Sequence, residues 1–256
     1  MSKNIVFIPW ILDESRATRS LPYKYSIASW KKWCEKNNCD LVIMDETICP
    51  VSEMKITWQR YHVLDILENS DIDYDQVLMV DADTIVHPDT PNFFEMTDGK
   101  FTAVHNEGSY DWICRSIENY HKHLFSDMEV PFGLNEYINT GFLIFNKSHK
   151  KFINDFLGFY NENSERINQI QETFKVGTCQ AVIQYLLKIK NVELNLLPYE
   201  YNMCDLPRKE LLDEQLTMTN VGWVYHYCAI PNNHDANLTM YWMKKTYEHL
   251  YGKLDD

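Results

Sequence analysis

The sequence predicts an α/β fold in which helices lie on either side of a mainly parallel sheet. Short apolar runs alternate with stretches of helical periodicity along the first third of the chain, an order typical of parallel strands joined by helices. The chain has 256 residues, of which 45% are hydrophobic, and can therefore bury one large core. No repeat or linker divides it, so we expect a single domain spanning residues 1–256.

The first third of the chain sets this order of elements. We expect a strand at 5–8, a helix at 22–37, a strand at 40–44, a helix at 57–68 and a strand at 76–80. The first helix is predicted from Tyr23, Ile27, Trp30 and Cys34, which recur at the spacing of one helix face. The strand at 76–80, "QVLMV", is an uninterrupted apolar run, which is typical of a strand buried on both faces.

The rest of the chain continues with both kinds of element. We expect a strand at 101–105, a helix near 110–125, the strand "GFLIF" at 141–145, helices near 149–160 and 178–189, a strand at 221–226 and a helix from 235 to 250. These segments are predicted from their apolar runs and helical spacing.

The composition excludes some classes of protein. The formal net charge is −13, from 24 Lys and Arg against 37 Asp and Glu, whereas nucleic-acid binding depends on clustered basic side chains. We therefore expect no nucleic-acid partner. No apolar run approaches the roughly 20 residues that span a bilayer, so we expect no transmembrane segment.

The cysteines and the first apolar segment indicate the compartment. Seven cysteines are scattered without a C-x-x-C pair, a pattern that favours free thiols in a reducing compartment over a zinc site. The segment "NIVFIPWIL" contains a proline and runs into charged residues without a small-residue cleavage site. It therefore indicates a buried strand rather than a signal peptide, and the expected location is the cytoplasm.

The stretch "DIDYDQVLMVDADT" contains the pattern D-x-D three times. Asp71, Asp73 and Asp75 have the spacing of a calcium-binding loop, but Gln76 replaces the glycine that such a loop needs at its sixth position. Ala82 stands where the twelfth position needs a glutamate. These aspartates precede the strand at its amino end, so we interpret them as a solvated loop.

Asp81 and Asp83 come directly after the buried strand. Alternate residues of an extended chain point to the same side, so the two carboxylates converge. Ligands of open α/β sheets bind beyond the carboxyl ends of the strands. Two adjacent anions at that position favour a bound cation, and carboxylate oxygens suit Mg²⁺ or Mn²⁺. The alternative is a strand end that carries surface acids.

Arg60 lies on the same face of its expected helix as the apolar residues Val63 and Leu67. A guanidinium on a core-facing side needs an anion, either Asp81 or the phosphate of a bound nucleotide. The alternative is that its aliphatic stem lies over the edge of the sheet. Arg16 and Arg19, after the first strand, are weaker phosphate candidates.

The segment Tyr74–Glu95, "YDQVLMVDADTIVHPDTPNFFE", resembles the central segment of the GT-A-fold glycosyltransferases, especially glycosyltransferase family 8. There an apolar strand ends in D-x-D-T and is followed by a proline, here Pro88, and an aromatic pair, here Phe93 and Phe94. Further segments resemble the family in the same order, namely "EYINTGFLIFNKSHKKF" at 136–152, "GTCQAVIQYLL" at 177–187, "LLPYEYNM" at 196–203 and "VYHYCAIP" at 224–231. Two features depart from it: Cys179 stands where the family has an acid, and the lysine-containing motif expected after His226 is missing.

The resemblance implies a GT-A, Rossmann-like fold whose mixed, mainly parallel sheet is flanked by helices. It places nucleotide-sugar binding in the half at about 1–105 and acceptor binding in the half at about 106–256. It implies Asp81, Asp83 and His226 as ligands of Mn²⁺ or Mg²⁺. Donor contacts are implied for Ile8, Pro9, Trp10, Arg60, Asp81, Ala82, Asn139, Thr140 and Gly141. Gln180, Asn139 and Asp83 are implied in catalysis.

These expectations describe a metal-dependent transferase that uses a nucleotide-diphosphate sugar, with a UDP-sugar as the first choice, and a glycan or other hydroxyl acceptor. Gln180 implies a retaining reaction, because it matches a residue beneath the anomeric carbon in retaining relatives. An amide is a poor nucleophile, so the expected mechanism is a front-face attack with an ion-pair-like transition state. An inverting reaction needs a carboxylate base, for which Asp111, Asp205 and Asp235 are candidates that nothing in the sequence ranks. One alternative is a non-catalytic descendant that binds nucleotide or sugar. Another is a Mg²⁺-dependent nucleotidyltransferase, which is disfavoured because no glycine-rich loop follows the first strand.

Overall fold

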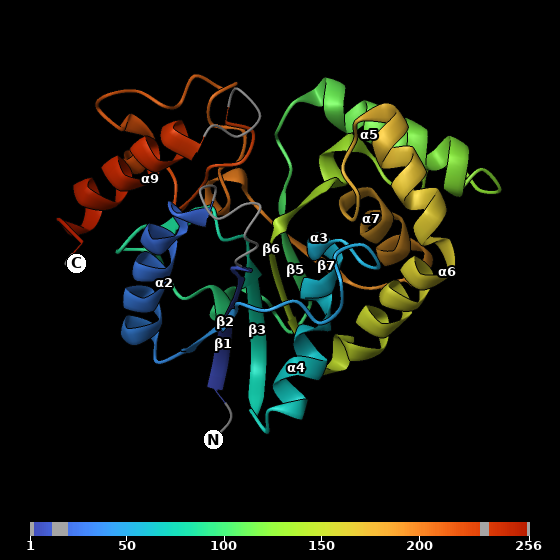
Figure 1. Cartoon of the computed structure of the whole chain (residues 1–256), viewed down its shortest axis with the longest axis horizontal. Coiled ribbons are helices and arrows are strands. Elements are labelled where there is room, and N and C mark those ends of the chain that lie inside the picture. The colour runs from blue at the N-terminus through green and yellow to red at the C-terminus, as the bar shows by residue number, and fades with distance from the viewer. Residues whose placement is uncertain (1–2, 12–19, 231–235, 255–256) are drawn as a thin grey trace.

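A computed structural model describes residues 3–11, 20–230 and 236–254. Arg16, Arg19 and Asp235 lie outside these residues. Within them a six-stranded sheet runs through the middle of the molecule in the order β2-β1-β3-β6-β5-β7 (Figure 1). Its strands are β1 (Lys3–Pro9), β2 (Asp40–Met44), β3 (Tyr74–Val80), β5 (Phe101–His105), β6 (Ile138–Asn146) and β7 (Leu194–Leu197).

The sheet is mixed and mainly parallel, as expected. β1 pairs in parallel with both β2 and β3, and β5 pairs in parallel with β7. β6 is antiparallel to β3 and β5 and joins the two parallel parts. All of its residues but the last are buried, because both of its edges are paired and helices cover its faces.

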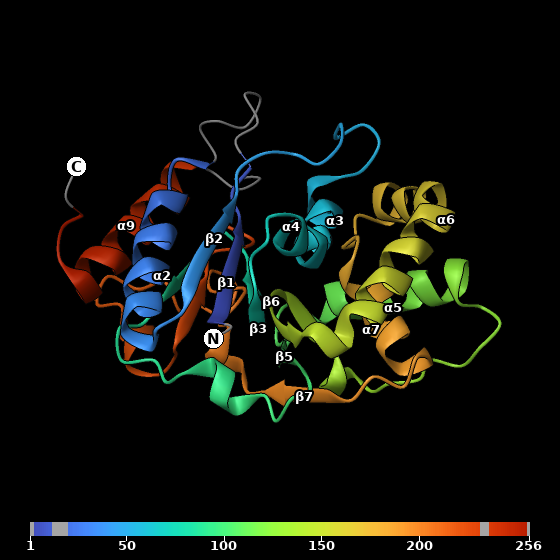
Figure 2. The same ribbon diagram turned by 90° about the horizontal axis from the view of Figure 1, so that it is seen from below.

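Helices cover both faces of the sheet. α2 (Tyr23–Asn37) and α9 (Ala236–Tyr251) lie together on one side, and α3 to α7 lie on the other (Figure 2). Alternate residues of β3 therefore enter different cores: Leu78 and Val80 pack with Trp30 of α2, whereas Val77 and Met79 face the other helices. None of the described helices has both the length and the apolar composition needed to cross a membrane.

The helix expected at 57–68 is divided, which corrects that prediction. It consists of α3 (Ile56–Gln59), the 3-10 turn η2 (Arg60–His62) and α4 (Val63–Asn69). The buried side chain of Gln59 accepts hydrogen bonds from the backbone N–H groups of Ile48 and Cys49 and donates to the carbonyl of Met54. These contacts tie α3 to the preceding loop, and the tighter 3-10 turn follows directly.

The second half of the chain forms α5 (Tyr110–Leu124), α6 (Lys150–Phe174) and α7 (Gln180–Ile189). α6 is 25 residues long and continues well beyond the expected end at 160, since Ile167 and Ile170 are buried and extend its apolar face. Two strands were not expected, β7 and β4 (Thr84–Val86). The late strand β8 is also shorter than expected and begins at Val224 rather than 221.

β4 and β8 (Val224–His226) form a separate two-stranded antiparallel sheet. Its register places Thr84 opposite His226. The carbonyl of Asp83 accepts a hydrogen bond of 2.8 Å from the N–H of Tyr227, which extends the pairing on the other side of His226. This small sheet brings a residue from near the end of the chain beside the carboxyl end of β3.

Candidate functional site

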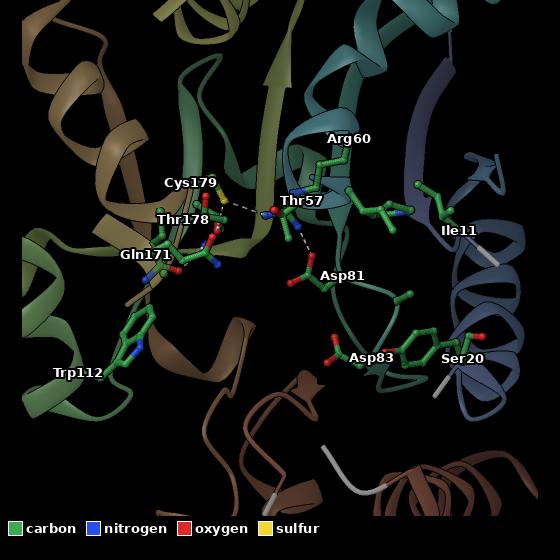
Figure 3. Close-up of a pocket in the computed structure, with 17 residues that line it drawn as sticks. Ile11, Ser20, Thr57, Arg60, Asp81, Asp83, Trp112, Gln171, Thr178 and Cys179 are labelled. Atoms are coloured by element: carbon green, nitrogen blue, oxygen red, sulfur yellow. Dashed lines mark hydrogen bonds and ion pairs between the residues drawn. The ribbon is translucent and has the colours of Figure 1, made fainter. Parts of the chain in front are cut away.

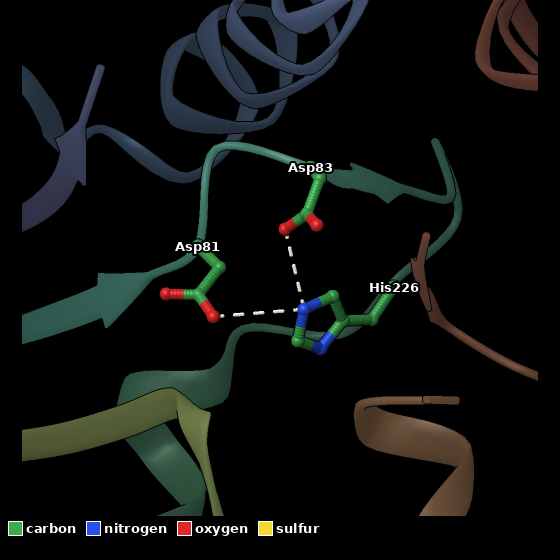
Figure 4. A group of neighbouring side chains, drawn as sticks. All are labelled: Asp81, Asp83 and His226. Atoms are coloured by element: carbon green, nitrogen blue, oxygen red, sulfur yellow. Dashed lines mark ion pairs between the residues drawn. The ribbon is translucent and has the colours of Figure 1, made fainter. Parts of the chain in front are cut away.

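Asp81, Asp83 and His226 form the one group of metal-ligand type that the described residues contain (Figure 4). The Nε2 atom of His226 lies 3.6 Å from Asp81 Oδ2 and 3.2 Å from Asp83 Oδ1, and all the potential ligand atoms lie within 4.8 Å of one another. An octahedral Mg²⁺ or Mn²⁺ with ligand distances of about 2.1 Å separates its ligands by roughly 3 to 4 Å. The three side chains therefore fit one divalent cation.

Asp71, Asp73 and Asp75, by contrast, lie at the amino end of β3 and are exposed. Asp73 forms a surface ion pair with Lys147, at 2.6 Å. Only the Asp81 and Asp83 pair joins the cluster.

The electrostatics of His226 also match a cation site. Its side chain is buried, which by itself lowers its pKa, but the neighbouring Cys228 and the carboxylate of Asp83 raise the pKa well above its ordinary value. The proton on the imidazole then neutralises part of the carboxylate charge. A divalent cation can perform the same task when it displaces that proton.

Gly141 of β6 allows these groups to approach so closely. A Cβ atom at this position would lie 2.4 Å from His226 Cε1, 2.8 Å from Asp81 Oδ2 and 2.9 Å from Asn139 Oδ1. The backbone N–H of Asp81 donates to the Gly141 carbonyl at 3.0 Å, so strand pairing holds this contact in place. Any side chain at 141 would displace the ligand cluster.

Arg60 is only 4% exposed and its Nη1 forms an ion pair with Asp81 Oδ1. Of the two anions expected as partners of Arg60, Asp81 is therefore in contact with its guanidinium. Nη2 lies 3.7 Å from Cys179 Sγ, and Nε has no hydrogen-bond partner among the described residues. The guanidinium thus places a buried positive charge next to the ligand cluster, and the described residues leave its Nε donor without an acceptor.

Two cavities adjoin at this point. The smaller, of about 400 Å³, extends from Pro9 and Ile11 past Arg60 to Thr178 and Cys179 (Figure 3). The larger, of about 790 Å³, lies on the His226 side. Both are lined by Asp81, Asp83, Trp112, Thr140 and Gln180. The ligand cluster therefore lies where two binding spaces meet, which suits a reaction between two substrates.

Gln180 begins α7 and is held against β6. Its Oε1 accepts the backbone N–H of Thr140 at 3.2 Å, whereas its Nε2 is shielded from solvent and lies near the side chain of Tyr137. Asn139 is also held: its Oδ1 accepts the N–H of Gly141 at 2.8 Å and the Nδ2 of Asn202 at 3.0 Å. Because the amide oxygen of Gln180 is engaged, the geometry suits a positioning group better than a nucleophile.

The predicted donor contacts at the end of β1 are not equally placed. Pro9 lines the smaller cavity, as does Ala82 on the opposite side. The side chain of Ile8 is wholly buried in the core beneath α2. Trp10 is partly buried and packs against the same core. Neither Ile8 nor Trp10 lines either cavity.

Sequence reasoning missed several cavity residues and left others unranked. Trp112 of α5 lines both cavities, yet in the sequence it is one aromatic residue in a helix. Asp205 lines the larger cavity, whereas Asp111 lines neither and forms a surface ion pair of 2.9 Å with Arg115. No local sequence signal distinguishes these aspartates, because their positions depend on loop packing.

Comparison of the sequence with protein-family models and with curated proteins finds no match. Solved structures do match. A glycosyltransferase involved in the glycosylation of the major capsid of PBCV-1 is 11% identical with a TM-score of 0.60, and the match covers 94% of this chain and 98% of that one. The galactosyltransferase LgtC, solved with donor and acceptor sugar analogs, is 15% identical with a TM-score of 0.54 over 99% of this chain and 96% of its own.

Mouse xyloside xylosyltransferase 1 in its apo form is 10% identical with a TM-score of 0.50 over 90% of this chain and 99% of its own. These identities are too low to transfer a substrate, but the matches extend over nearly the whole chain. Together with the mixed sheet and the D-x-D pair at the end of β3, they show that the protein has the GT-A fold of glycosyltransferases.

Proposed function

We propose that the protein is a metal-dependent glycosyltransferase that transfers a sugar from a nucleotide-diphosphate sugar, UDP-linked in the first instance, to a glycan or other hydroxyl acceptor. The main support for this proposal is that Asp81, Asp83 and His226 lie where two cavities meet, next to the buried guanidinium of Arg60. A diphosphate is the ligand that needs both a divalent cation and an adjacent guanidinium.

Each residue has a defined task in this proposal. The three ligands hold Mn²⁺ or Mg²⁺, which when bound stabilises negative charge on the departing nucleotide diphosphate. Arg60 binds a phosphate oxygen and offsets the same charge. Asn139, Thr140 and Gly141 line the sugar, with Ala82 and Pro9 at the end of β1 toward the nucleotide.

Retention of the anomeric configuration is proposed from Gln180. Gln180 lines both cavities, and its oxygen is held by the N–H of Thr140. This fixed side chain positions the sugar while the acceptor hydroxyl attacks on the side of the leaving group. The seven free cysteines further support a reducing compartment, and we propose the cytoplasm.

Asp83→Ala tests the metal site. In the wild type, UDP with Mn²⁺ at a hundredfold excess over its dissociation constant is expected to stabilise the fold by about 2.7 kcal/mol, a rise in Tm of roughly 5 to 10 °C. Asp83→Ala is expected to abolish the part of this rise that depends on Mn²⁺. A thermal-shift titration of UDP with and without Mn²⁺ measures both.

The matched control is Asp75→Ala, which removes an exposed aspartate from the same D-x-D-rich stretch and is expected to change nothing. Absence of any stabilisation by UDP and Mn²⁺ in the wild type would count against the proposal. Release of UDP from UDP-glucose and UDP-galactose then separates a transferase from a non-catalytic binding protein, since only the transferase releases it at a rate that Asp83→Ala lowers.

Arg60→Met tests whether Arg60 binds a phosphate of the nucleotide or only positions the metal ligand Asp81. Removing the guanidinium frees Asp81, so Mn²⁺ alone is expected to bind as tightly as in the wild type or more tightly. UDP in the presence of Mn²⁺ is expected to bind at least tenfold more weakly, because a charge-assisted hydrogen bond to phosphate is lost. Isothermal titration measures the two affinities separately.

Arg60→Lys is the control, since it keeps the charge but not the planar donor group. It is expected to fall between the wild type and Arg60→Met for UDP. Equal losses of Mn²⁺ and UDP affinity in Arg60→Met would instead show that Arg60 serves only to position Asp81.

A further inference from the structure

The larger cavity has its own polar wall, distinct from the metal ligands. Its residues come from three segments, one after β5, one after the 3-10 turn η6 (Tyr199–Tyr201) and one after β8. They include Asn106, Gly108, Asp205, Arg208 and Ile230. Asp205 is unusual among them, because it is a carboxylate whose side chain is only 6% exposed.

The backbone holds Asp205 in a defined position. Two residues earlier, Met203 bridges to Tyr225 and its carbonyl accepts the N–H of His226 at 3.0 Å. The carbonyl of Asp205 accepts the N–H of Arg208 at 3.1 Å. Asp205 has a φ of +61°, a left-handed conformation that aspartate adopts only at some energetic cost. The segment that carries the metal ligand His226 therefore also carries this carboxylate.

The carboxylate of Asp205 has few donors for its charge. Arg208 Nη1 lies 3.3 Å from Oδ1 and 3.4 Å from Oδ2, but the Arg208 side chain is 57% exposed. Oδ1 is shielded from solvent and accepts no hydrogen bond from any described residue, so Oδ2, next to Gly108, is the oxygen that a molecule in the larger cavity would meet. A buried ionised carboxylate is costly unless several donors meet it. The wall of the cavity thus has an acceptor of hydrogen bonds that the described protein groups leave incompletely satisfied.

Gly108 keeps the space next to this carboxylate free. A Cβ at this position would lie 3.3 Å from Asp205 Oδ2 and 2.8 Å from Asn106 Oδ1. The Asn106 Oδ1 already accepts the N–H of Gly108 at 2.8 Å, which fixes the amide with its NH₂ group available. The amide of Asn106 and the carboxylate of Asp205 therefore form a donor and an acceptor on one wall.

Trp112 supplies an apolar surface in the same cavity. It is partly exposed, and the tight spacing to Gly177, where a Cβ would lie 2.8 Å from the ring, holds the indole in place. An aromatic face combined with a few fixed polar groups is the arrangement that binds a molecule with both C–H and O–H surfaces. A pyranose ring has this character, whereas a phosphate or a carboxylic acid would be repelled by Asp205.

We propose that Asp205 is the specificity-determining residue for the acceptor, and that it accepts hydrogen bonds from hydroxyl groups of a neutral sugar bound in the larger cavity. This inference rests on the proposed function for the identity of the reaction, although the sugar site itself can be tested without it. Asn106 contributes the matching donor and Trp112 the apolar face. The hydroxyls supply the donors that the buried carboxylate lacks.

The test measures sugar binding without nucleotide or metal. Methyl β-D-glucopyranoside, methyl β-D-galactopyranoside and lactose are titrated into the full chain, with binding followed by ligand-observed NMR. At least one sugar is expected to bind the wild type, and Asp205→Asn is expected to raise its Kd at least tenfold, because an amide oxygen is a weaker acceptor than a carboxylate. Asparagine tolerates a left-handed backbone, so this variant is expected to fold.

Asp111→Asn is the matched control, since Asp111 is 75% exposed on α5 and lines neither cavity. It is expected to leave the Kd unchanged. If none of the three sugars binds, or if Asp205→Asn binds them as tightly as the wild type, the assignment is wrong. Sugar binding that depends on Asp205 without any UDP and Mn²⁺ stabilisation would instead keep this site and overturn the proposed transferase.

A second measurement uses turnover. The same sugars are expected to accelerate UDP release from the donor in the wild type, and Asp205→Asn is expected to raise the KM for the sugar, whereas Asp111→Asn is expected to leave this KM unchanged. A fall in kcat with an unchanged KM would contradict a role in binding the acceptor.

Discussion

Replacing Gly141 by alanine is expected to abolish Mn²⁺-dependent binding of UDP and to lower sugar transfer at least about a hundredfold. The added methyl group would lie 2.4 Å from His226 Cε1 and 2.8 Å from Asp81 Oδ2, so both ligands must move. The Gly141 carbonyl accepts the N–H of Asp81 at 3.0 Å and its N–H donates to Asn139 Oδ1 at 2.8 Å, and these bonds oppose a retreat of the backbone. Displacing reacting groups by about 1 Å is enough to lose two orders of magnitude in rate.

Gly158→Ala is the matched control for this substitution. Gly158 lies within α6, and a Cβ there would meet nothing within 4 Å. Alanine is expected to stabilise the helix by about 0.5 to 1 kcal/mol and to leave Mn²⁺ and UDP binding unchanged. If thermal-shift titration showed that Gly141→Ala keeps the full response to Mn²⁺, the close packing of the ligand cluster against β6 would not be needed for metal binding.

Trp58→Ala is expected to have the largest effect on stability, a loss of about 3 to 5 kcal/mol in the free energy of unfolding. The indole is wholly buried and stacks between Phe156, at a centroid distance of 4.8 Å, and Tyr160, at 4.2 Å. Its Nε1 donates to Thr178 Oγ1 at 2.8 Å. Alanine leaves a cavity between α3 and α6 and removes that donor. Urea denaturation followed by circular dichroism measures the change.

Trp58→Phe separates the ring from the hydrogen bond. It keeps much of the stacking and is expected to lose less than half as much stability as Trp58→Ala. Thr178 lines the smaller cavity beside Cys179, so UDP binding is expected to weaken even in this milder variant. A loss below about 1 kcal/mol in Trp58→Ala would mean that α3 and α6 close over the gap.

The pairing of Asp81 with Asp83 could be predicted because it depends on local geometry. The buried apolar strand places both aspartates at the ligand end of the sheet. The expected extended chain is wrong, however, because β3 ends at Val80 and a turn at Ala82 and Asp83 brings the carboxylates together. Both side chains lie in one cluster, whereas the earlier aspartates are exposed at the amino end of β3. His226 was predicted as a ligand only because its segment resembles a short strand of the family. In the structure, the antiparallel pairing of Thr84 with His226 brings this histidine beside the two aspartates.

The direction of β6 and the partner of Arg60 depend on contacts between distant segments. All but the last of the nine residues of β6 are buried, as in either a parallel or an antiparallel central strand, so its composition does not determine its direction. Arg60 reaches Asp81 from a 3-10 turn, whereas the sequence predicted a continuous helix at that point. Helical periodicity identifies a buried face but does not show where the helix will tighten.

The chain by itself therefore determined the class of fold and the carboxylate pair, because both follow from periodicity over a few neighbouring residues. The cavities, the close approach at Gly141 and the choice of Asp205 over Asp111 were decided only by the tertiary structure. These features join segments more than 60 residues apart, and no local pattern records which loops will meet once the sheet has formed.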